Sequence, residues 1–265
     1  MVPEPHAAFL DNAIARLTAD ERLVGVAAGG SYATRSMDEF SDLDLVVAVE
    51  PTAYEAMLGE RQALAQSLGP LLAAFTGEHV GEPRLLVCLY GPPLLHVDLK
   101  FVSLADAAAR VEEPVILWER DGRLSAALRG RRPAYPEPDL QWIEDRFWAW
   151  VHYGAAKIGR GELFEAIDGL AFLRSRVLGP LALMSRGSRP SGVRRLELLA
   201  PDLAEELRAT VATPSADSCA AALRAAAESY RRLRARLGGK ALRRRSTAEV
   251  AALQYLEAVV ERGRV

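Results

Sequence analysis

The feature of this sequence that most constrains its fold is the stretch 41–50, SDLDLVVAVE, in which two aspartates alternate with leucines. Side chains along a β-strand point to opposite faces in turn, so Leu43 and Leu45 lie on one face while Asp42 and Asp44 lie on the other. The apolar run that follows predicts a buried strand. Two carboxylates on one face of a buried strand repel each other and lose hydration, so the pattern predicts a cation between them.

A glycine-serine turn precedes these aspartates. The apolar segment 23–29, LVGVAAG, predicts a strand, and Gly30 and Ser31 follow it directly. Glycine allows a tight turn and a close approach of the backbone to a ligand, and the exposed N–H groups of such a turn suit a phosphate. Many glycine-serine turns are only turns, so this one gains its meaning from the aspartates that come after it.

A third aspartate, Asp98, interrupts the apolar segment 94–102, LLHVDLKFV. Carboxylates on neighbouring strands are hard oxygen ligands of the kind that Mg²⁺ takes, and two such ions about 3.5–4 Å apart can hold a phosphoryl group. Two alternatives stay open: a solvated loop mouth for Asp42 and Asp44, and an outward-facing edge position for Asp98.

The first half of the chain alternates helix and strand patterns, and the second half is helical. Apolar periodicity in the first half predicts a helix over 5–18, strands over 23–29, 43–50, 84–91 and 94–102, and a helix over 52–75. In the second half it predicts helices over 139–158, 161–179, 202–212 and 216–237, and a last helix from Ser246. We expect an α/β (α+β) domain with a mixed sheet over 1–130 and an all-α helical-bundle domain over 131–265, joined at the proline-rich stretch 130–139.

Charge is distributed unevenly along a chain whose formal net charge is only −2. Residues 1–120 carry 18 acidic and 8 basic side chains, whereas residues 121–265 carry 17 and 25. Either the two halves attract each other, or they form a cleft between an acidic metal-holding domain and a basic domain that meets an anionic ligand. The second half includes a basic run of eight residues: Arg231, Arg232, Arg234, Arg236, Lys240, Arg243, Arg244 and Arg245. No nucleic-acid motif accompanies it, so we expect a solvated face that pairs with the acidic first half.

Cysteine content and hydropathy exclude several classes of protein. Cys88 and Cys219 are the only cysteines and lie far apart, so there is neither a disulfide framework nor a zinc-ligand spacing. No apolar run reaches membrane-spanning length, and the first residues lack the pattern of a signal peptide. We therefore expect a cytoplasmic protein.

Taken together, Gly30-Ser31, Asp42-Leu43-Asp44 and Asp98 resemble the motif of the DNA polymerase β-like nucleotidyltransferase superfamily. The motif covers residues 25–102, and the size of the chain and its helical second half are similar to the small-molecule nucleotidyltransferases that modify aminoglycoside and lincosamide antibiotics. The resemblance implies that Gly30 and Ser31 hold the nucleotide triphosphate, and that Asp42, Asp44 and Asp98 bind two Mg²⁺ ions.

The same resemblance implies an adenylyltransferase that moves AMP from ATP to a hydroxyl of a small molecule, possible substrates being aminoglycoside-type antibiotics, and releases pyrophosphate. Its expected role is antibiotic resistance, and its partners are ATP and a hydroxylated acceptor rather than nucleic acid or a membrane. Two alternatives remain: an antitoxin-like enzyme that adenylylates a protein, and a nucleotide-binding module that has lost its chemistry.

The second half contributes further candidates. In several antibiotic nucleotidyltransferases a carboxylate of the helical domain acts as general base on the acceptor, and Glu162 or Glu165 is similar in position, with Asp98 as the alternative base. Their competing interpretation is a solvated helix face with local ion pairs. Lys157 and Lys100 are rival candidates for the triphosphate. The aromatic candidates for stacking on a base or sugar are Tyr32, His96, Trp148 and Tyr153.

Overall fold

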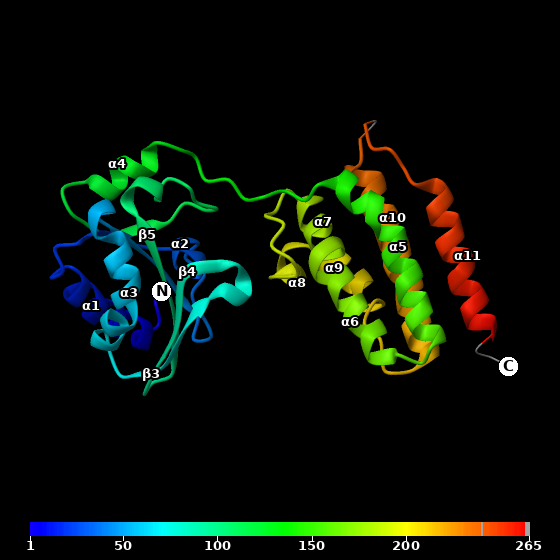
Figure 1. Cartoon of the computed structure of the whole chain (residues 1–265), viewed down its shortest axis with the longest axis horizontal. Coiled ribbons are helices and arrows are strands. Elements are labelled where there is room, and N and C mark those ends of the chain that lie inside the picture. The colour runs from blue at the N-terminus through cyan, green and yellow to red at the C-terminus, as the bar shows by residue number, and fades with distance from the viewer. Residues whose placement is uncertain (240, 263–265) are drawn as a thin grey trace. The chain divides into compact units, whose positions relative to one another are not determined.

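The computed structural model describes residues 1–239 and 241–262, and it divides the chain into two compact units, Met1–Tyr135 (unit 1) and Pro136–Val265 (unit 2). Each unit has its own hydrophobic core. The predicted fold class is confirmed, since a mixed sheet with helices is followed by a region whose regular elements, among the residues described, are all helical (Figure 1).

Unit 1 is built on a six-stranded sheet with the order β3-β4-β5-β2-β1-β6. Its strands are β1 (Leu23–Ala28), β2 (Leu43–Val49), β3 (Leu71–Gly77), β4 (Glu82–Tyr90), β5 (Leu95–Ser103) and β6 (Val115–Glu119). Strands β2 and β5 are parallel, and the other neighbours are antiparallel. The sheet is therefore mixed, and its parallel pair lies at the centre.

Helices cover the two faces of this sheet unequally. They are α1 (Glu4–Leu17), α2 (Gly30–Ala33), α3 (Tyr54–Ser67) and α4 (Arg123–Arg129), with short 3-10 turns at Pro51–Ala53, Glu78–Val80 and Leu104–Asp106. Helices α1 and α3 pack on the face that carries Leu43 and Leu45. On the other face, α4 packs against Ala48 and Val102. By strand alternation Asp44 and Asp98 belong to this second face, four positions along their strands from the contact with α4.

Unit 2 is a set of helices around one core. They are α5 (Leu140–Gly159), α6 (Leu163–Leu173), a π-helical turn (Arg174–Leu178), α7 (Gly179–Met184), α8 (Leu196–Leu199), α9 (Pro201–Arg208), α10 (Ala216–Leu237) and α11 (Ser246–Arg262). Helices α5, α10 and α11 run alongside one another (Figure 1). Asp139 caps α5 by accepting bonds from the backbone N–H groups of Gln141 and Trp142, as its side chain predicts.

Two differences from the sequence prediction have clear physical causes. The helix predicted over 52–75 is wrong beyond Ser67, because Gly69 and Pro70 end α3 and the chain then pairs with β4 as strand β3. Strand β6 and helices α4 and α8 were not predicted, since each has at most seven residues and too little periodicity to be recognised.

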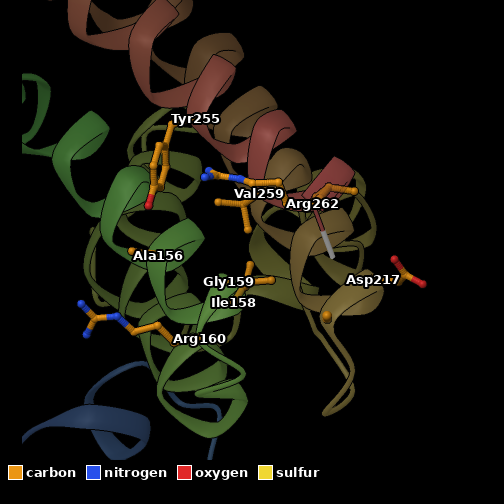
Figure 2. Close-up of a pocket in the computed structure, with 10 residues that line it drawn as sticks. Ala156, Ile158, Gly159, Arg160, Asp217, Tyr255, Val259 and Arg262 are labelled. Atoms are coloured by element: carbon orange, nitrogen blue, oxygen red, sulfur yellow. The ribbon is translucent and has the colours of Figure 1, made fainter. Parts of the chain in front are cut away.

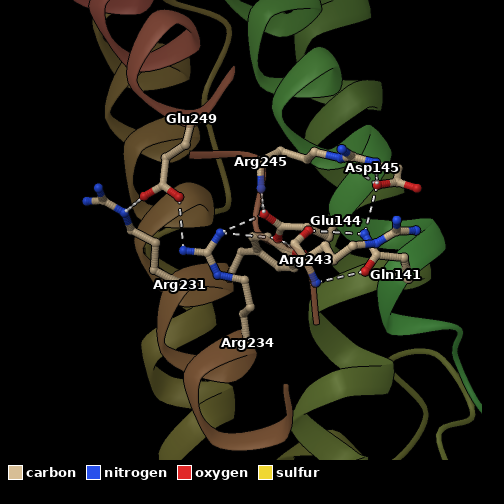
Figure 3. Close-up of polar contacts among 9 residues, drawn as sticks. Gln141, Glu144, Asp145, Arg231, Arg234, Arg243, Arg245 and Glu249 are labelled. Atoms are coloured by element: carbon tan, nitrogen blue, oxygen red, sulfur yellow. Dashed lines mark hydrogen bonds and ion pairs between the residues drawn. The ribbon is translucent and has the colours of Figure 1, made fainter. Parts of the chain in front are cut away.

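The expected pairing of the basic run with the acidic first half is wrong for four of its arginines. Arg231, Arg232, Arg234 and Arg245 all form ion pairs with carboxylates of unit 2. Arg234 is nearly buried and bridges Glu144 of α5 and Glu249 of α11 (Figure 3). Lys240 lies outside the described residues. The run therefore holds the helices of its own unit together.

Candidate active site

Two of the three predicted carboxylates lie side by side on the sheet. Asp44 of β2 and Asp98 of β5 are register partners across the parallel pair, and both are half-buried. Neighbouring residues in register point to the same face, so these two side chains share one surface. Asp42 lies just before β2 begins, also half-buried.

The glycine turn contacts Asp44 directly. Gly30 has a φ of 55°, a conformation that favours glycine, and a Cβ atom at this position would lie 2.0 Å from Oδ2 of Asp44. The N–H of Gly29 also donates to the backbone carbonyl of Asp44, with 2.8 Å between N and O. The absence of a side chain at Gly30 is what allows the turn to lie against the carboxylate.

Ser31 follows in the first turn of α2, and its hydroxyl oxygen is buried without a hydrogen-bond partner. A buried polar atom without a partner costs free energy, and such atoms in native proteins call for an explanation such as a missing ion or ligand. Its place beside the Gly29–Gly30 turn fits the predicted contact of Ser31 with a nucleotide.

A cavity of about 260 Å³ opens over this face of the sheet. Its lining includes Gly29, Asp44, Glu82, Asp98, Lys100, Arg110 and Glu112. The cavity thus combines the glycine turn, two of the predicted carboxylates and one of the predicted lysines in unit 1.

Lys100 is engaged within this cavity. Its Nζ lies 2.8 Å from Glu82, which also pairs with Arg84 at 2.7 Å. The bond from Arg84, reinforced by Lys100, lowers the pKa of Glu82 to about 2. A phosphate would have to draw Lys100 away from Glu82. His96 lies two residues before Asp98 on β5 and contacts it, with 3.0 Å between Nε2 of His96 and Oδ1 of Asp98.

The sequence analysis did not find Glu112, which occupies the turn itself. The backbone N–H of Gly30 donates to Oε1 of Glu112 at 2.7 Å. The two residues are 82 positions apart, and Glu112 lies in the irregular segment between the 3-10 turn Leu104–Asp106 and β6. No local pattern could have revealed this contact, since it depends on the path of a loop.

The oxygen donors of the site match only part of the set that was predicted to bind Mg²⁺. Within 1–239 and 241–262, no three or more histidine, cysteine or acidic side chains form a group that could hold a metal ion, so Asp42 is not gathered with the other two. Magnesium is commonly held by one or two carboxylates together with water and substrate phosphates. Asp44, Asp98 and the unpartnered hydroxyl of Ser31 are oxygen donors of this kind and fit such an ion.

The predicted residues of unit 2 form a separate polar cluster. Nζ of Lys157 lies 2.5 Å from Glu162 and 2.9 Å from Glu165, and the hydroxyl of Tyr153 donates to Glu165. These bonds raise the pKa of Lys157, with Glu162 as the main cause. They lower the pKa of Glu165, with Tyr153 as the main cause. Asp168 is exposed.

The aromatic candidates differ in their access to a ligand. Trp148 is only 2% exposed and packs with Phe147 and Tyr230 in the core of unit 2, so its predicted stacking role is wrong. Tyr153 is 51% exposed. Tyr32 is half-buried at the α2 turn, and His96 is exposed beside Asp98.

Unit 2 also contains a cavity of about 390 Å³ that none of the predicted site residues lines. Figure 2 shows Tyr255, Val259 and Arg262 of α11 on one side of it and Ile158 of α5 below them. Its walls also include Asp217 at the start of α10. All the residues that line it belong to unit 2.

Comparisons with known proteins give the following picture. Neither the known protein families nor the curated proteins include a significant match to this sequence. Among solved structures, the neighbours include an aminoglycoside 6-adenyltransferase from Bacillus subtilis, 15% identical, with a TM-score of 0.40 over 98% of this chain and 99% of that one. A nucleotidyltransferase-like protein from Exiguobacterium sibiricum is 16% identical, with a TM-score of 0.37 over 88% of this chain and 75% of that one. At these scores the likeness carries no weight, and the function has to be inferred from the residues of the site.

Among the described residues, no helix combines the length and the apolar character needed to cross a membrane.

Proposed function

We propose that this protein is a Mg²⁺-dependent nucleotidyltransferase that transfers AMP from ATP to a hydroxyl of a small molecule and releases pyrophosphate. The observation that carries the proposal is the pairing of Asp44 and Asp98 in register, directly against the glycine turn. The backbone N–H groups of the turn can bind phosphate oxygens, and the paired carboxylates can bind a metal ion. Together they suit a triphosphate with its metal.

Each residue has a defined role in this proposal. Gly29, Gly30 and Ser31 bind the phosphates through backbone N–H groups and a hydroxyl. Asp44 and Asp98 would hold Mg²⁺, and Asp42 would have to move toward them to act as the further ligand that a second ion requires. The metal would neutralise charge on the phosphates and polarise the phosphorus. Holding the reactants in line accounts for much of the rate in such transfers.

The acceptor hydroxyl has to lose a proton, and we assign this role first to Asp98. His96, 3.0 Å from Asp98, orients its carboxylate. Glu162 and Glu165 are the other candidates. The bond from Tyr153 lowers the pKa of Glu165, which makes it a weaker base at neutral pH. Lys100 or Lys157 would contact the triphosphate after leaving its carboxylate partner.

The charge of unit 1 favours a cationic acceptor. Residues 1–135 hold 19 acidic and 12 basic side chains, and such an excess attracts cations to the surface. A hydroxylated polyamine, the chemistry of an aminoglycoside, meets this requirement.

The test is to incubate the protein with Mg²⁺, each nucleoside triphosphate and a panel of hydroxylated acceptors, and to measure pyrophosphate. Release should require ATP together with a cationic hydroxylated acceptor. In Asp44→Asn it should fall about 100-fold or more, because a metal ligand is worth several kcal/mol of transition-state stabilisation. The apo variant should be no less stable, since one of two adjacent like charges is gone. A destabilised Asp44→Asn protein with normal turnover would contradict the metal site.

The choice of base is tested separately with Glu162→Gln and Glu165→Gln. If either carboxylate takes the proton, its variant should lose turnover by about 100-fold while the other stays near wild type. Near-wild-type turnover in both assigns the proton to Asp98.

A second candidate, a nucleotide-binding module without transfer activity, is favoured by two contacts. Glu112 occupies the N–H of Gly30, and Lys100 is engaged with Glu82. In that case calorimetry with Mg²⁺ and ATP should show binding, while no small-molecule or polypeptide acceptor yields pyrophosphate. If AMP from labelled ATP became attached to a polypeptide in the same incubation, the protein would instead be a protein-adenylylating enzyme.

A further inference from the structure

The carboxylate of Glu112 lies where an anion is expected to bind. Its Oε1 accepts the N–H of Gly30 at 2.7 Å, and a Cβ atom on Gly29 would lie at the same distance from this oxygen. Glu112 is half-buried in the cavity that also contains Asp44 and Asp98. A negatively charged oxygen thus contacts both glycines of the turn.

This position conflicts with nucleotide binding in two ways. A single N–H cannot donate a full hydrogen bond to both Glu112 and a phosphate oxygen. A carboxylate beside the turn also repels an incoming phosphate, and the neighbouring Asp44 and Asp98 already make the cavity negative. Glu112 therefore has to leave the turn before a phosphate can use it.

Glu112 lies in the segment 107–114, and Arg110, two residues before Glu112, anchors this segment. The guanidinium of Arg110 donates to the carbonyl oxygens of Leu128 and Arg131 at 2.9 and 2.7 Å. The backbone carbonyl of Arg110 accepts the N–H of Ala134, with 3.0 Å between N and O. Beyond this anchor Val111 is 49% exposed, and Glu113 is exposed and pairs back to Arg110, with 2.5 Å between its Oε2 and Nη2 of Arg110.

The far end of the segment is fixed as well. Strand β6 begins at Val115, one residue after Pro114, and pairs with β1. Residues 111–113 therefore form a short span between two anchored points. Such a span can move Glu112 off the turn through a few backbone rotations, while the bonds of Arg110 and the pairing of β6 stay intact.

On the basis of the proposed function, we propose that Glu112 is an intramolecular competitor of the nucleotide phosphate. Its carboxylate closes the glycine turn in the free protein and is displaced when a triphosphate binds. The affinity for nucleotide is then reduced by the fraction of molecules in which the turn is open. A ligand with several phosphates and a metal displaces Glu112, whereas a weaker single anion does not.

The test measures the affinity of the full-length protein for ATP with Mg²⁺ and for inorganic tripolyphosphate with Mg²⁺ by calorimetry. Glu112→Ala should bind both ligands about tenfold more tightly than wild type, because a charged hydrogen bond no longer has to be broken. Glu112→Gln should show a smaller gain, since the amide oxygen can still accept from Gly30. Asp106→Asn is the control, because it removes one exposed carboxylate from the 3-10 turn that precedes the segment and leaves the contact of Glu112 with Gly30 unchanged.

Hydrogen exchange supplies a second readout. In wild type, peptides covering 107–114 should exchange faster when ATP and Mg²⁺ are added. In Glu112→Ala they should exchange fast without any ligand, and in Asp106→Asn they should respond as in wild type.

The outcomes separate this proposal from the proposed function. If wild type binds ATP and Glu112→Ala binds it equally or more weakly, the competitor role is overturned and Glu112 contributes to binding instead. If Asp106→Asn gains as much as Glu112→Ala, the effect is one of net charge and the competitor role is overturned too. If neither wild type nor any variant binds ATP or tripolyphosphate, the proposed function fails and the competitor role fails with it.

Discussion

At the scale of single residues, Gly30 is the position where the candidate site tolerates least change. Its φ is positive, and a Cβ atom at this position would point directly at Oδ2 of Asp44. Gly122 has a φ of 69° and no atom within 4 Å of the place where its Cβ would lie. Alanine at Gly122 therefore tests the cost of the backbone conformation alone. Alanine at Gly30 adds the cost of displacing the carboxylate of Asp44.

We predict that Gly30→Ala lowers nucleotide affinity by about tenfold or more, because Asp44 has to move and the turn is strained. Gly122→Ala should cost about 1 kcal/mol of stability and leave the affinity unchanged. Calorimetric titration with ATP and Mg²⁺, together with urea unfolding of both variants, checks this. Unchanged affinity in Gly30→Ala would mean that the turn does not bind nucleotide.

Glu82 gives a residue-scale prediction for pH. Bonds from Arg84 and Lys100 lower its pKa from 4.5 to about 2. A depressed carboxyl pKa stabilises the fold above pH 4.5, and this contribution disappears as the pH falls toward 2.

Glu82→Gln should therefore be less stable than wild type by about 1–2 kcal/mol at pH 7, and the difference should shrink as the pH falls below 4.5. Urea unfolding at a series of pH values measures it. Glu39→Gln, at an exposed position outside the helices and strands, is the control and should cost little stability at pH 7. A difference that grows on acidification would contradict the assignment of the pKa shift.

At the scale of secondary-structure elements, a buried ion pair joins three helices of unit 2. Glu144 of α5 is fully buried and accepts bonds from Arg234 of α10, from the hydroxyl of Tyr230 and from the N–H of Arg245. Burial alone would raise the pKa of Glu144, but these bonds together lower it. Arg234 also pairs with Glu249 at the start of α11 (Figure 3).

Removing the cation should leave two acids without their buried partner. Arg234→Met is expected to destabilise the protein by about 3–5 kcal/mol. Arg232→Met should cost less than about 1 kcal/mol, because its pairs with Glu206 and Glu228 are exposed. Denaturant unfolding followed by circular dichroism compares the two, and equal small losses would show that the buried pair is not a stabilising contact.

At the scale of the whole molecule, the chain consists of two units with separate cores. Unit 1 contains the sheet, the glycine turn, the carboxylates and Glu112, all within Met1–Tyr135. Unit 2 contains Lys157, Glu162 and Glu165. The glycine turn and the carboxylates of the proposed nucleotide site thus lie in unit 1, whereas unit 2 contains the rival candidate Lys157 and is the candidate source of acceptor contacts.

A fragment of residues 1–135 should fold and bind ATP with Mg²⁺ within about tenfold of the full chain, because its core and turn are intact. It should lose transfer to the acceptor, since the acceptor contacts of unit 2 are gone. Calorimetry and the pyrophosphate assay test the two halves of this prediction. A folded fragment with full transfer activity would remove unit 2 from the reaction.

The sequence by itself determined the features that depend on neighbouring residues. Alternation over 43–49 and 95–103 placed Asp44 and Asp98 on the less buried faces of their strands, because side-chain direction repeats every two residues. The cap at Asp139 and the helical second half followed from equally local rules.

Tertiary structure alone decided which distant groups meet. The sequence does not state that β2 and β5 are parallel neighbours, that Glu112 contacts Gly30 across 82 positions, or that Arg234 pairs with Glu144 across 90. Strand pairing and loop paths are selected by the packing of the whole core, and the free energy of each contact depends on the burial and charge that this packing creates. For that reason the sequence indicated the paired carboxylates, while only the fold revealed the glutamate that occupies their turn.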